Sequence, residues 1–206
     1  KLNVILANYL SLFKNNAFML GTVALGVLYI PCLAWVGLSP VILISNAKLT
    51  VIQYALWQIP LFAACILGNF FLRHLTHRRD LIQIIAYGSV FGMLGLLLMG
   101  LLPWLFGTHY LLLIPGLTLY GFGLGITSGP CNRHLLFITP ISKGTTNALI
   151  SMLQLAFMGV GTELANLCYQ SQNNLYFGGY AAACALVYSI LMCGAMLSPQ
   201  WCVKTV

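Results

Sequence analysis

One carboxylate within a long apolar segment is the residue of this sequence with the clearest potential for chemistry. The chain has two acidic residues, of which Asp80 follows a basic run and Glu163 lies among apolar neighbours. A carboxylate inside a membrane is costly and usually functional, for example as a proton carrier. Glu163 lies about seven residues, or roughly 10 Å at 1.5 Å per residue, from the predicted outer end of its segment. It is therefore expected to act either in coupling or as a structural acid bonded to a neighbouring helix or to interfacial water.

Three further polar side chains lie within apolar segments. Gln58 and Gln154 can donate and accept hydrogen bonds, to a ligand or between helices. Arg133 lies near the predicted inner end of its segment, where a long cationic side chain normally extends to the membrane surface. The two glutamines are therefore candidate ligand contacts, and the arginine is not.

The block Pro31-Cys32-Leu33-Ala34-Trp35 lies in the middle of an apolar segment. A proline at this place frees a backbone carbonyl and bends a helix, whereas tryptophan normally lies at membrane surfaces. Both features favour a kinked helix that lines a cavity, and transporters bind substrates at such helices. The candidate substrate-binding residues are Pro31, Cys32, Leu33, Trp35, Val36, Gln58 and Gln154.

An enzymatic function is not supported by the residues present. The run Gly125-Ile126-Thr127-Ser128-Gly129 misses the G-x-S-G pattern of a six-helix intramembrane serine protease by one residue. The four histidines lie in loops or at a helix end, so no Ser/His pair forms. The seven cysteines include no C-x-x-C pair, and no histidine has a zinc-binding spacing. We therefore expect no catalytic residue, metal, cofactor or disulfide.

The elements that must position these residues are membrane-spanning helices. Of the 206 residues, 60% are hydrophobic and 5% are charged, against about 25% charged in soluble domains. Each apolar block exceeds the roughly 18 residues that mark a spanning helix, and short alternating segments of a barrel do not occur. The sequence predicts an all-α membrane protein with six spans: 17–44, 51–72, 81–102, 110–138, 145–169 and 175–197.

The basic residues predict the orientation. Of the nine Lys and Arg residues, Lys48 lies alone on one side, and the other eight lie on the opposite side. This bias predicts that both termini are cytoplasmic. Because the net charge of +7 is spread over loops and forms no basic patch, we expect no nucleic-acid partner.

Small residues and segment boundaries complete the predicted architecture. Glycines recur every four residues at 121, 125 and 129 and at 88 and 92, a spacing that favours close helix packing.

We expect a cytoplasmic linker at 1–16, a six-helix bundle at 17–198 and a cytoplasmic tail at 199–206. The sequence opens with Lys1 and a linker-like stretch, from which we expect a piece of a longer polypeptide.

Several short stretches, in this order and spacing, carry a family resemblance. They are Leu33-Ala34-Trp35 with Ser39-Pro40, Gln58-Ile59-Pro60, Gly68-Asn69, Arg73 with Arg78-Arg79, Tyr120-Gly121-Phe122-Gly123, Ser142-Lys143-Gly144-Thr145, Met152-Leu153-Gln154 and Gly161-Thr162-Glu163. The sequence resembles the carboxy-terminal half of MdfA-like bacterial multidrug/proton antiporters of the major facilitator superfamily. The resemblance covers nearly the whole chain.

The resemblance implies a cytoplasmic gate formed by Gly68, Arg73, Arg78 and Arg79. These positions are similar to the second copy of the superfamily's cytoplasmic signature, but Leu72 stands where that signature has an acid. The resemblance further implies a multi-pass protein of the bacterial inner membrane that exports lipophilic small molecules in exchange for protons. It implies that the main proton-carrying and substrate-binding acids lie on an amino-terminal six-helix half.

Three hypotheses follow. The chain is one half of an efflux antiporter that works with an amino-terminal half, surrounded by membrane lipids. Alternatively, it is a non-transporting fragment of a truncated or split gene that acts at most as an assembly partner. A third alternative is an autonomous six-helix carrier that dimerises.

Overall fold

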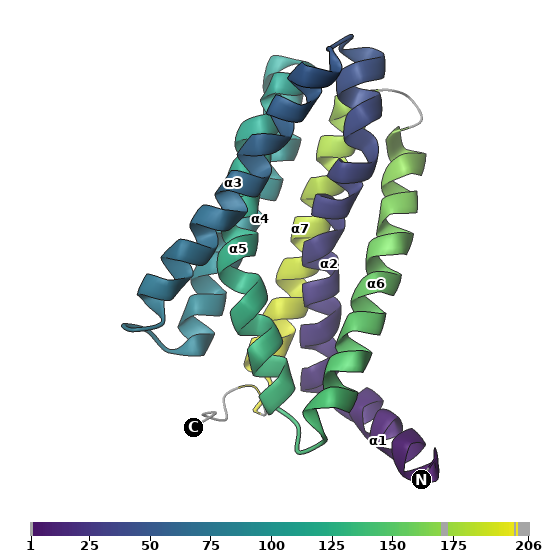
Figure 1. Cartoon of the computed structure of the whole chain (residues 1–206), viewed down its shortest axis with the longest axis vertical. Helices are drawn as coiled ribbons and strands as arrows, with labels where there is room; N and C mark the ends of the chain where they lie inside the picture. Colours follow the sequence, from purple (N-terminus) through teal and green to yellow (C-terminus); the bar gives the residue numbers. More distant parts are fainter. Residues whose placement is uncertain (1, 170–172, 200, 202–206) are drawn as a thin grey trace.

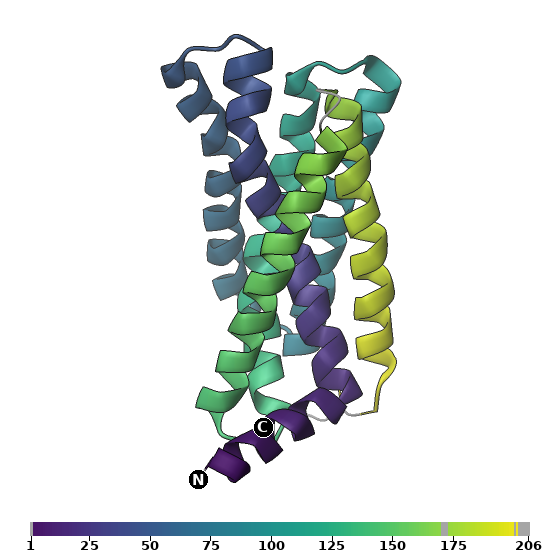
Figure 2. The ribbon, with the colours of Figure 1, turned by 90° about the vertical axis from the view of Figure 1, so that its right-hand side faces the viewer.

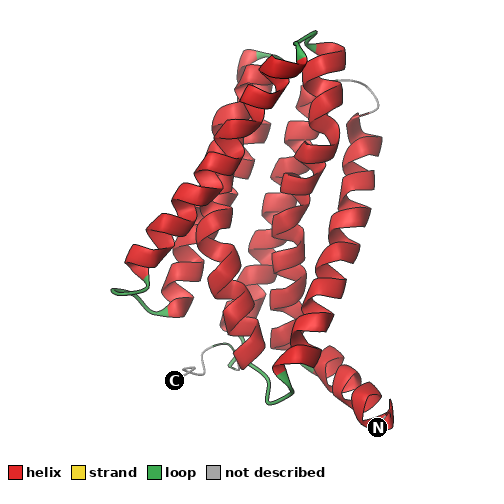
Figure 3. Ribbon diagram, in the orientation of Figure 1, coloured by secondary structure: helices red, strands yellow, loops and turns green. Residues whose placement is uncertain are grey.

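A computed structural model of the chain describes residues 2–169, 173–199 and 201. Every secondary-structure element among these residues is a helix. Six long apolar helices can cross a membrane (Figures 1 and 3), which confirms the predicted all-α membrane fold. The elements are α1 (Leu2–Lys14), α2 (Asn16–Ser39), a π-helical turn η1 (Pro40–Asn46), α3 (Val51–Leu75), α4 (Leu81–Phe106), a 3₁₀ turn η2 (Tyr110–Leu112), α5 (Leu113–Phe137), α6 (Lys143–Cys168) and α7 (Asn174–Leu197).

Local side chains explain where the helices begin and end. Asn15 accepts a hydrogen bond from the backbone N–H of Phe18 at 3.1 Å and so caps α2. Thr50 and Gln53 form a reciprocal capping box at the start of α3. Gly107 directly follows the last residue of α4 and ends that helix. Its φ is 99°, a conformation that glycine adopts without strain.

The six spans form two layers. Helices α4 and α7 pack on each other, and they lie on the opposite side from α2 and α3 (Figures 1 and 2). Helix α5 packs between α4 and α3, whereas α6 packs mainly on α2. Helices α3 and α6 therefore lie at the two flanks, each supported by one main neighbour.

Several predicted boundaries were wrong by a few residues. Pro103 was expected in a loop, but it is buried inside α4, which continues to Phe106. The first span continues through the π-helical turn to Asn46 and ends beyond the predicted residue 44. The predicted cytoplasmic linker at 1–16 contains the helix α1 at Leu2–Lys14, and its place on the cytoplasmic side stays a prediction. Part of the predicted turn at 171–174 and most of the predicted tail at 199–206, including Lys204, lie outside the described residues.

Two glycines of the predicted repeats, Gly121 and Gly125, bring backbones together, whereas Gly88, Gly92 and Gly129 lie against side chains. A side chain at Gly125 would collide with the backbone oxygen of Cys65 on α3, and one at Gly121 would approach the backbone oxygen of Leu61 at 2.7 Å. A side chain at Gly123 would collide with the backbone of Gly92 on α4. Helix α5 thus contacts both neighbours backbone to backbone, which only small residues allow.

Candidate functional site

A tyrosine from α5 bonds the backbone of α2 beside Pro31, where the sequence predicts a kink. The hydroxyl of Tyr120 donates to the backbone oxygen of Leu28 at 2.5 Å, and it accepts from the backbone N–H of Cys32 at 3.2 Å. In a regular helix these two backbone groups would bond each other. Tyr120, which is fully buried, therefore bridges two backbone groups of α2 beside Pro31, and proline is a recognised cause of helix kinks.

A second polar contact joins α2 to α3 one turn further along. The indole N–H of Trp35 donates to Oε1 of Gln58 at 3.0 Å, and Nε2 of Gln58 donates to the hydroxyl of Ser39 at 2.8 Å. Trp35 has no exposed surface, and its ring packs 6.1 Å from that of Phe177 on α7. Trp35 was predicted to bind substrate, but it is buried inside the bundle. Its indole N–H holds the amide of Gln58 in place.

The other predicted residues of α2 form an open strip. Val36 is 42% exposed, and Cys32 and Leu33 are half-buried. Pro31 itself is buried. In Figure 1, α2 lies between α3 and α6, and the exposure of Val36 shows that the described elements leave this part of α2 uncovered. The strip is apolar, and Gln58 borders it as a half-buried amide.

Gln154 and Glu163 lie on different faces of α6. Gln154 is half-buried, and its Nε2 donates to Oδ1 of Asn132 on α5 at 3.4 Å. Glu163 is exposed, and within the described part of the chain no hydrogen bond or ion pair involves it. By helical geometry it lies about 160° around α6 from Gly161, whose surroundings include Ile30 of α2. The carboxylate therefore points away from this bundle.

The predicted gate residues lie at the end of α3 and in the following loop. Gly68 is buried, and a side chain there would collide with the backbone oxygen of Phe122 on α5. Arg73, Arg78 and Arg79 are exposed. The guanidinium of Arg79 lies 5.9 Å from the ring centre of Tyr87, a cation–π contact. Gly68 thus sets the α3–α5 distance, and the three arginines extend from that end of the bundle.

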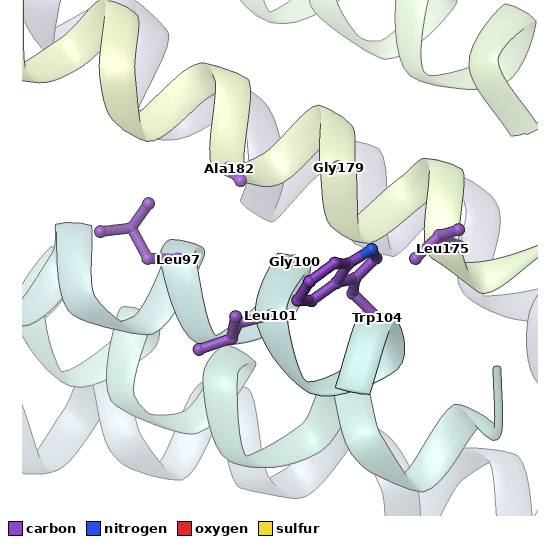
Figure 4. A pocket seen from close by; sticks show the side chains of 7 residues that line it. All are labelled: Leu97, Gly100, Leu101, Trp104, Leu175, Gly179 and Ala182. Atoms are coloured by element: carbon purple, nitrogen blue, oxygen red, sulfur yellow. The ribbon is translucent and has the colours of Figure 1, made fainter. Parts of the chain in front are cut away.

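Cavities also lie outside this set of residues. A groove of 610 Å³ between α4 and α7 is lined by Leu97, Gly100, Leu101, Trp104, Leu175, Gly179 and Ala182 (Figure 4). Its side chains are apolar apart from the indole N–H of Trp104. The groove lies in the layer opposite the α2 strip, so it is not part of the predicted substrate-binding face.

A second cavity, of 250 Å³, lies where several helices meet at the end of the bundle opposite α1. Asn46 donates to the phenol oxygen of Tyr169 at 2.8 Å, and that hydroxyl donates to Asn174 at 3.2 Å. Asn174 in turn donates to the backbone oxygen of Thr108 at 2.7 Å. These contacts tie α2, α4, α6 and α7 together at one end.

The sequence reasoning missed Tyr120, Ser39, Asn132 and Phe177, which contact the predicted residues. Tyr120 belongs to a stretch that carries the family resemblance, and a tyrosine between glycines in an apolar segment was a usable signal. No signal in the sequence indicated which backbone carbonyl it would reach, because Leu28 lies 92 positions away.

Comparison with known proteins adds the evidence of descent. No family model matches the chain. The multidrug transporter MdfA of Yersinia pestis bv. Antiqua (strain Angola) is 37% identical over 167 residues, which cover 79% of this chain and 40% of the relative. The MdfA of Escherichia coli O157:H7 is 34% identical over 185 residues, 90% of this chain and 45% of the relative. The chain is homologous to the MdfA multidrug transporters.

A third relative, the MdfA of Edwardsiella piscicida, is 33% identical over 186 residues, 90% of this chain and 45% of the relative. The chain thus spans about half the length of the MdfA relatives it matches. These relatives are transporters, which supports the expectation from the residues that the chain is not an enzyme.

Proposed function

We propose that this chain is the carboxy-terminal six-helix half of a multidrug efflux antiporter that exports lipophilic small molecules in exchange for protons. The observation that carries the proposal is the homology to MdfA multidrug transporters, which extends over 90% of this chain and 45% of the E. coli relative. Six spans account for this aligned block. An amino-terminal half of six helices would supply the opposing wall of a central cavity.

The substrate wall in this proposal is the open strip of α2 with its bordering amides. Leu33, Val36 and Cys32 supply apolar contact, and the kink at Pro31 exposes them. Gln58 and Gln154 border the wall as hydrogen-bonding groups, and Trp35 acts indirectly, because it fixes the amide of Gln58. A mostly apolar wall discriminates poorly between lipophilic compounds, which is consistent with a broad substrate range.

Conformational switching would be controlled at the other end of α3. Gly68 holds α3 against the backbone of α5, and Arg73, Arg78 and Arg79 extend where an opposing half could pair with them. Since Leu72 replaces the acid of the signature, the pairing acids would come from the amino-terminal half.

Membrane placement follows from the charges. In this proposal, the end that carries Lys14, Arg133, Lys143 and the three gate arginines faces the cytoplasm, with both termini on that side of a bacterial inner membrane. Lys48 alone marks the periplasmic end among the basic side chains. Membrane lipids cover α4 and α7.

Proton coupling is assigned to the amino-terminal half, and Glu163 is assigned a structural role. A proton carrier must reach water from both sides in turn, which favours a position near the middle of the membrane. Glu163 lies near the outer end of α6 and faces away from its own bundle, so its partner would be interfacial water or the other half.

Drug resistance in an efflux-deficient bacterium tests the proposal. Expressed alone, the chain should confer no resistance to lipophilic cations or chloramphenicol-like drugs. Co-expression with the amino-terminal half of an MdfA relative should restore resistance, and the drug-exposed cells should then lose resistance when the proton gradient is collapsed. The matched control is the same pair with Val36→Glu, which places a charge on the apolar strip without disturbing a buried contact.

The outcomes separate the hypotheses. No resistance from the pair, with both halves folded and in the membrane, would favour a non-transporting fragment. Resistance from the chain alone would contradict the two-half proposal and favour a carrier that dimerises, which cross-linking in native membranes would then detect.

A further inference from the structure

Helix α1 presents three different faces. Leu12 is fully buried and Tyr9 is half-buried, and both pack against the bundle, where α1 contacts α2 and α6. Leu6, Leu10 and Phe13 are 54%, 60% and 45% exposed. The helix therefore carries an apolar stripe that the described part of the chain does not cover.

The three faces have a geometry that fits a membrane surface. At 3.6 residues per turn, positions 6, 10 and 13 lie within about 60° of one another, and positions 7, 11 and 14 lie about 100° further around. The latter are Ala7, Ser11 and Lys14, all exposed. This stripe, whose polar side chains are Ser11 and Lys14, points away from both the bundle-facing side and the apolar side, as water would require for a helix lying in an interface.

The position of α1 sets its depth. Only Asn15 separates α1 from α2, and its side chain caps the first turn of that span. In Figures 1 and 2, α1 runs outward from the end of the bundle and does not continue the direction of α2. The apolar stripe is thus held at the level at which the first span enters the bilayer.

The charges at this end identify the lipid. Lys14, Arg133 and Lys143 lie here, at the start of α2, the end of α5 and the start of α6. Glu163 lies at the opposite end of α6. We propose that α1 is an interfacial anchor, which inserts Leu6, Leu10 and Phe13 among the lipids of the adjoining leaflet and binds preferentially to anionic headgroups. This inference requires the membrane fold but not the proposed transport function.

Nitroxide labels on the full chain in lipid nanodiscs test the orientation. The seven cysteines are first replaced, and then Leu10→Cys and Ser11→Cys are introduced separately. The label at position 10 should contact dissolved oxygen more than a water-soluble nickel chelate, and the label at position 11 should show the reverse. Equal chelate contact at both positions would overturn the proposal.

Hydrogen exchange of α1 in the native-cysteine chain gives an independent readout. Its amides should exchange about tenfold more slowly in nanodiscs with phosphatidylglycerol than in pure phosphatidylcholine, because anionic lipid holds the helix in the interface. Leu10→Ser should reduce this protection, and Ala7→Ser, on the water-facing stripe, should not. Protection that is independent of lipid charge and of Leu10→Ser would overturn the proposal. So would protection that appears only at high protein-to-lipid ratio or only with an amino-terminal half, which would assign the stripe to a protein partner.

Discussion

The two sides of the bundle are joined by different kinds of contact. On the α3–α5–α4 side, several glycines lie against backbone: side chains at Gly95 and Gly123 would collide with backbone atoms of Tyr120 and Gly92. On the α2–α6 side, glycines lie against side chains. A Cβ at Gly26 would lie 3.1 Å from a ring atom of Phe157, and one at Gly161 would lie 2.5 Å from the side chain of Ile30.

This difference bears on which helices can move. A contact between two backbones has no degree of freedom that relieves a misfit, so α3, α4 and α5 should behave as one block. A contact between a glycine and a flexible side chain can adjust by a rotamer change. Helix α6 should therefore shift against α2 at lower cost than α3 or α4 can shift against α5.

The largest effect is expected when a methyl group is added to the backbone contact. Gly123→Ala places a Cβ against the backbone of Gly92, so the helices must separate along their length, and we expect a loss of more than about 3 kcal/mol or failure to fold. Gly159→Ala on α6 is the matched control, because nothing lies within 4 Å of its Cβ position. Thermal unfolding in detergent, followed by the reaction of buried Cys131 and Cys184 with a thiol probe, measures both. Equal melting of the two variants would remove the basis of the rigid block.

A smaller loss is expected at the side-chain contact. Gly26→Ala should cost about 1 to 3 kcal/mol, because the ring of Phe157 must move by a few tenths of an ångström. The decisive variant is the pair Gly26→Ala with Phe157→Leu, in which the smaller side chain should restore much of the loss. No such rescue is available at Gly123, because the atoms that oppose its Cβ position belong to the backbone. A double variant no more stable than Gly26→Ala alone would argue against the adjustable contact.

Tyr120 connects the two sides, and its removal should have an intermediate-to-small effect. Tyr120→Phe deletes the hydroxyl that bonds Leu28 and Cys32. Hydrogen bonds between membrane helices contribute about 0.6 kcal/mol on average and about 1.7 at most, and the two freed backbone groups can bond each other if α2 straightens. We therefore expect a small loss of melting temperature with a clear change in the distance across the kink, measured between spin labels at positions 23 and 37. A change in stability without a change in distance would mean that Pro31 alone sets the kink.

The polar and apolar pattern was sufficient to predict six spans, because membrane burial acts on each helix locally. The glycine spacing predicted the backbone contacts at Gly121 and Gly125. The polar and apolar pattern was also sufficient to identify Pro31 and Gln58 as unusual within a span. It could not indicate that Trp35 turns inward, since that depends on Phe177, more than a hundred positions along the chain. Pro103 was misplaced for a local reason: it lies within the last turn of α4, and the carbonyl that its ring leaves unpaired is near the membrane surface.

The same reasoning explains why the role of Glu163 needs an experiment. A carboxylate was identifiable from composition, but its direction depends on how α6 rotates against α2, which is set by Gly161 and Ile30. Because that direction is away from the bundle, the isolated chain should be nearly indifferent to Glu163→Gln. A change within about 0.5 kcal/mol is expected, as for a surface substitution.

In the assembled transporter, Glu163→Gln separates structural bonding from proton coupling. Gln keeps the shape of the side chain and can still hydrogen-bond to interfacial water or to a donor on the other half, but it cannot titrate. If the role is structural, the Glu163→Gln variant should largely retain drug-induced proton release from vesicles. Glu163→Leu should then weaken assembly of the two halves more than Glu163→Gln does, because Leu cannot hydrogen-bond. Lipid exposure predicts the opposite order, since Leu would then stabilise α6. Retained drug binding with lost proton release in the Gln variant would make Glu163 a coupling residue, and it would assign proton transfer to the mobile α2–α6 side of the bundle.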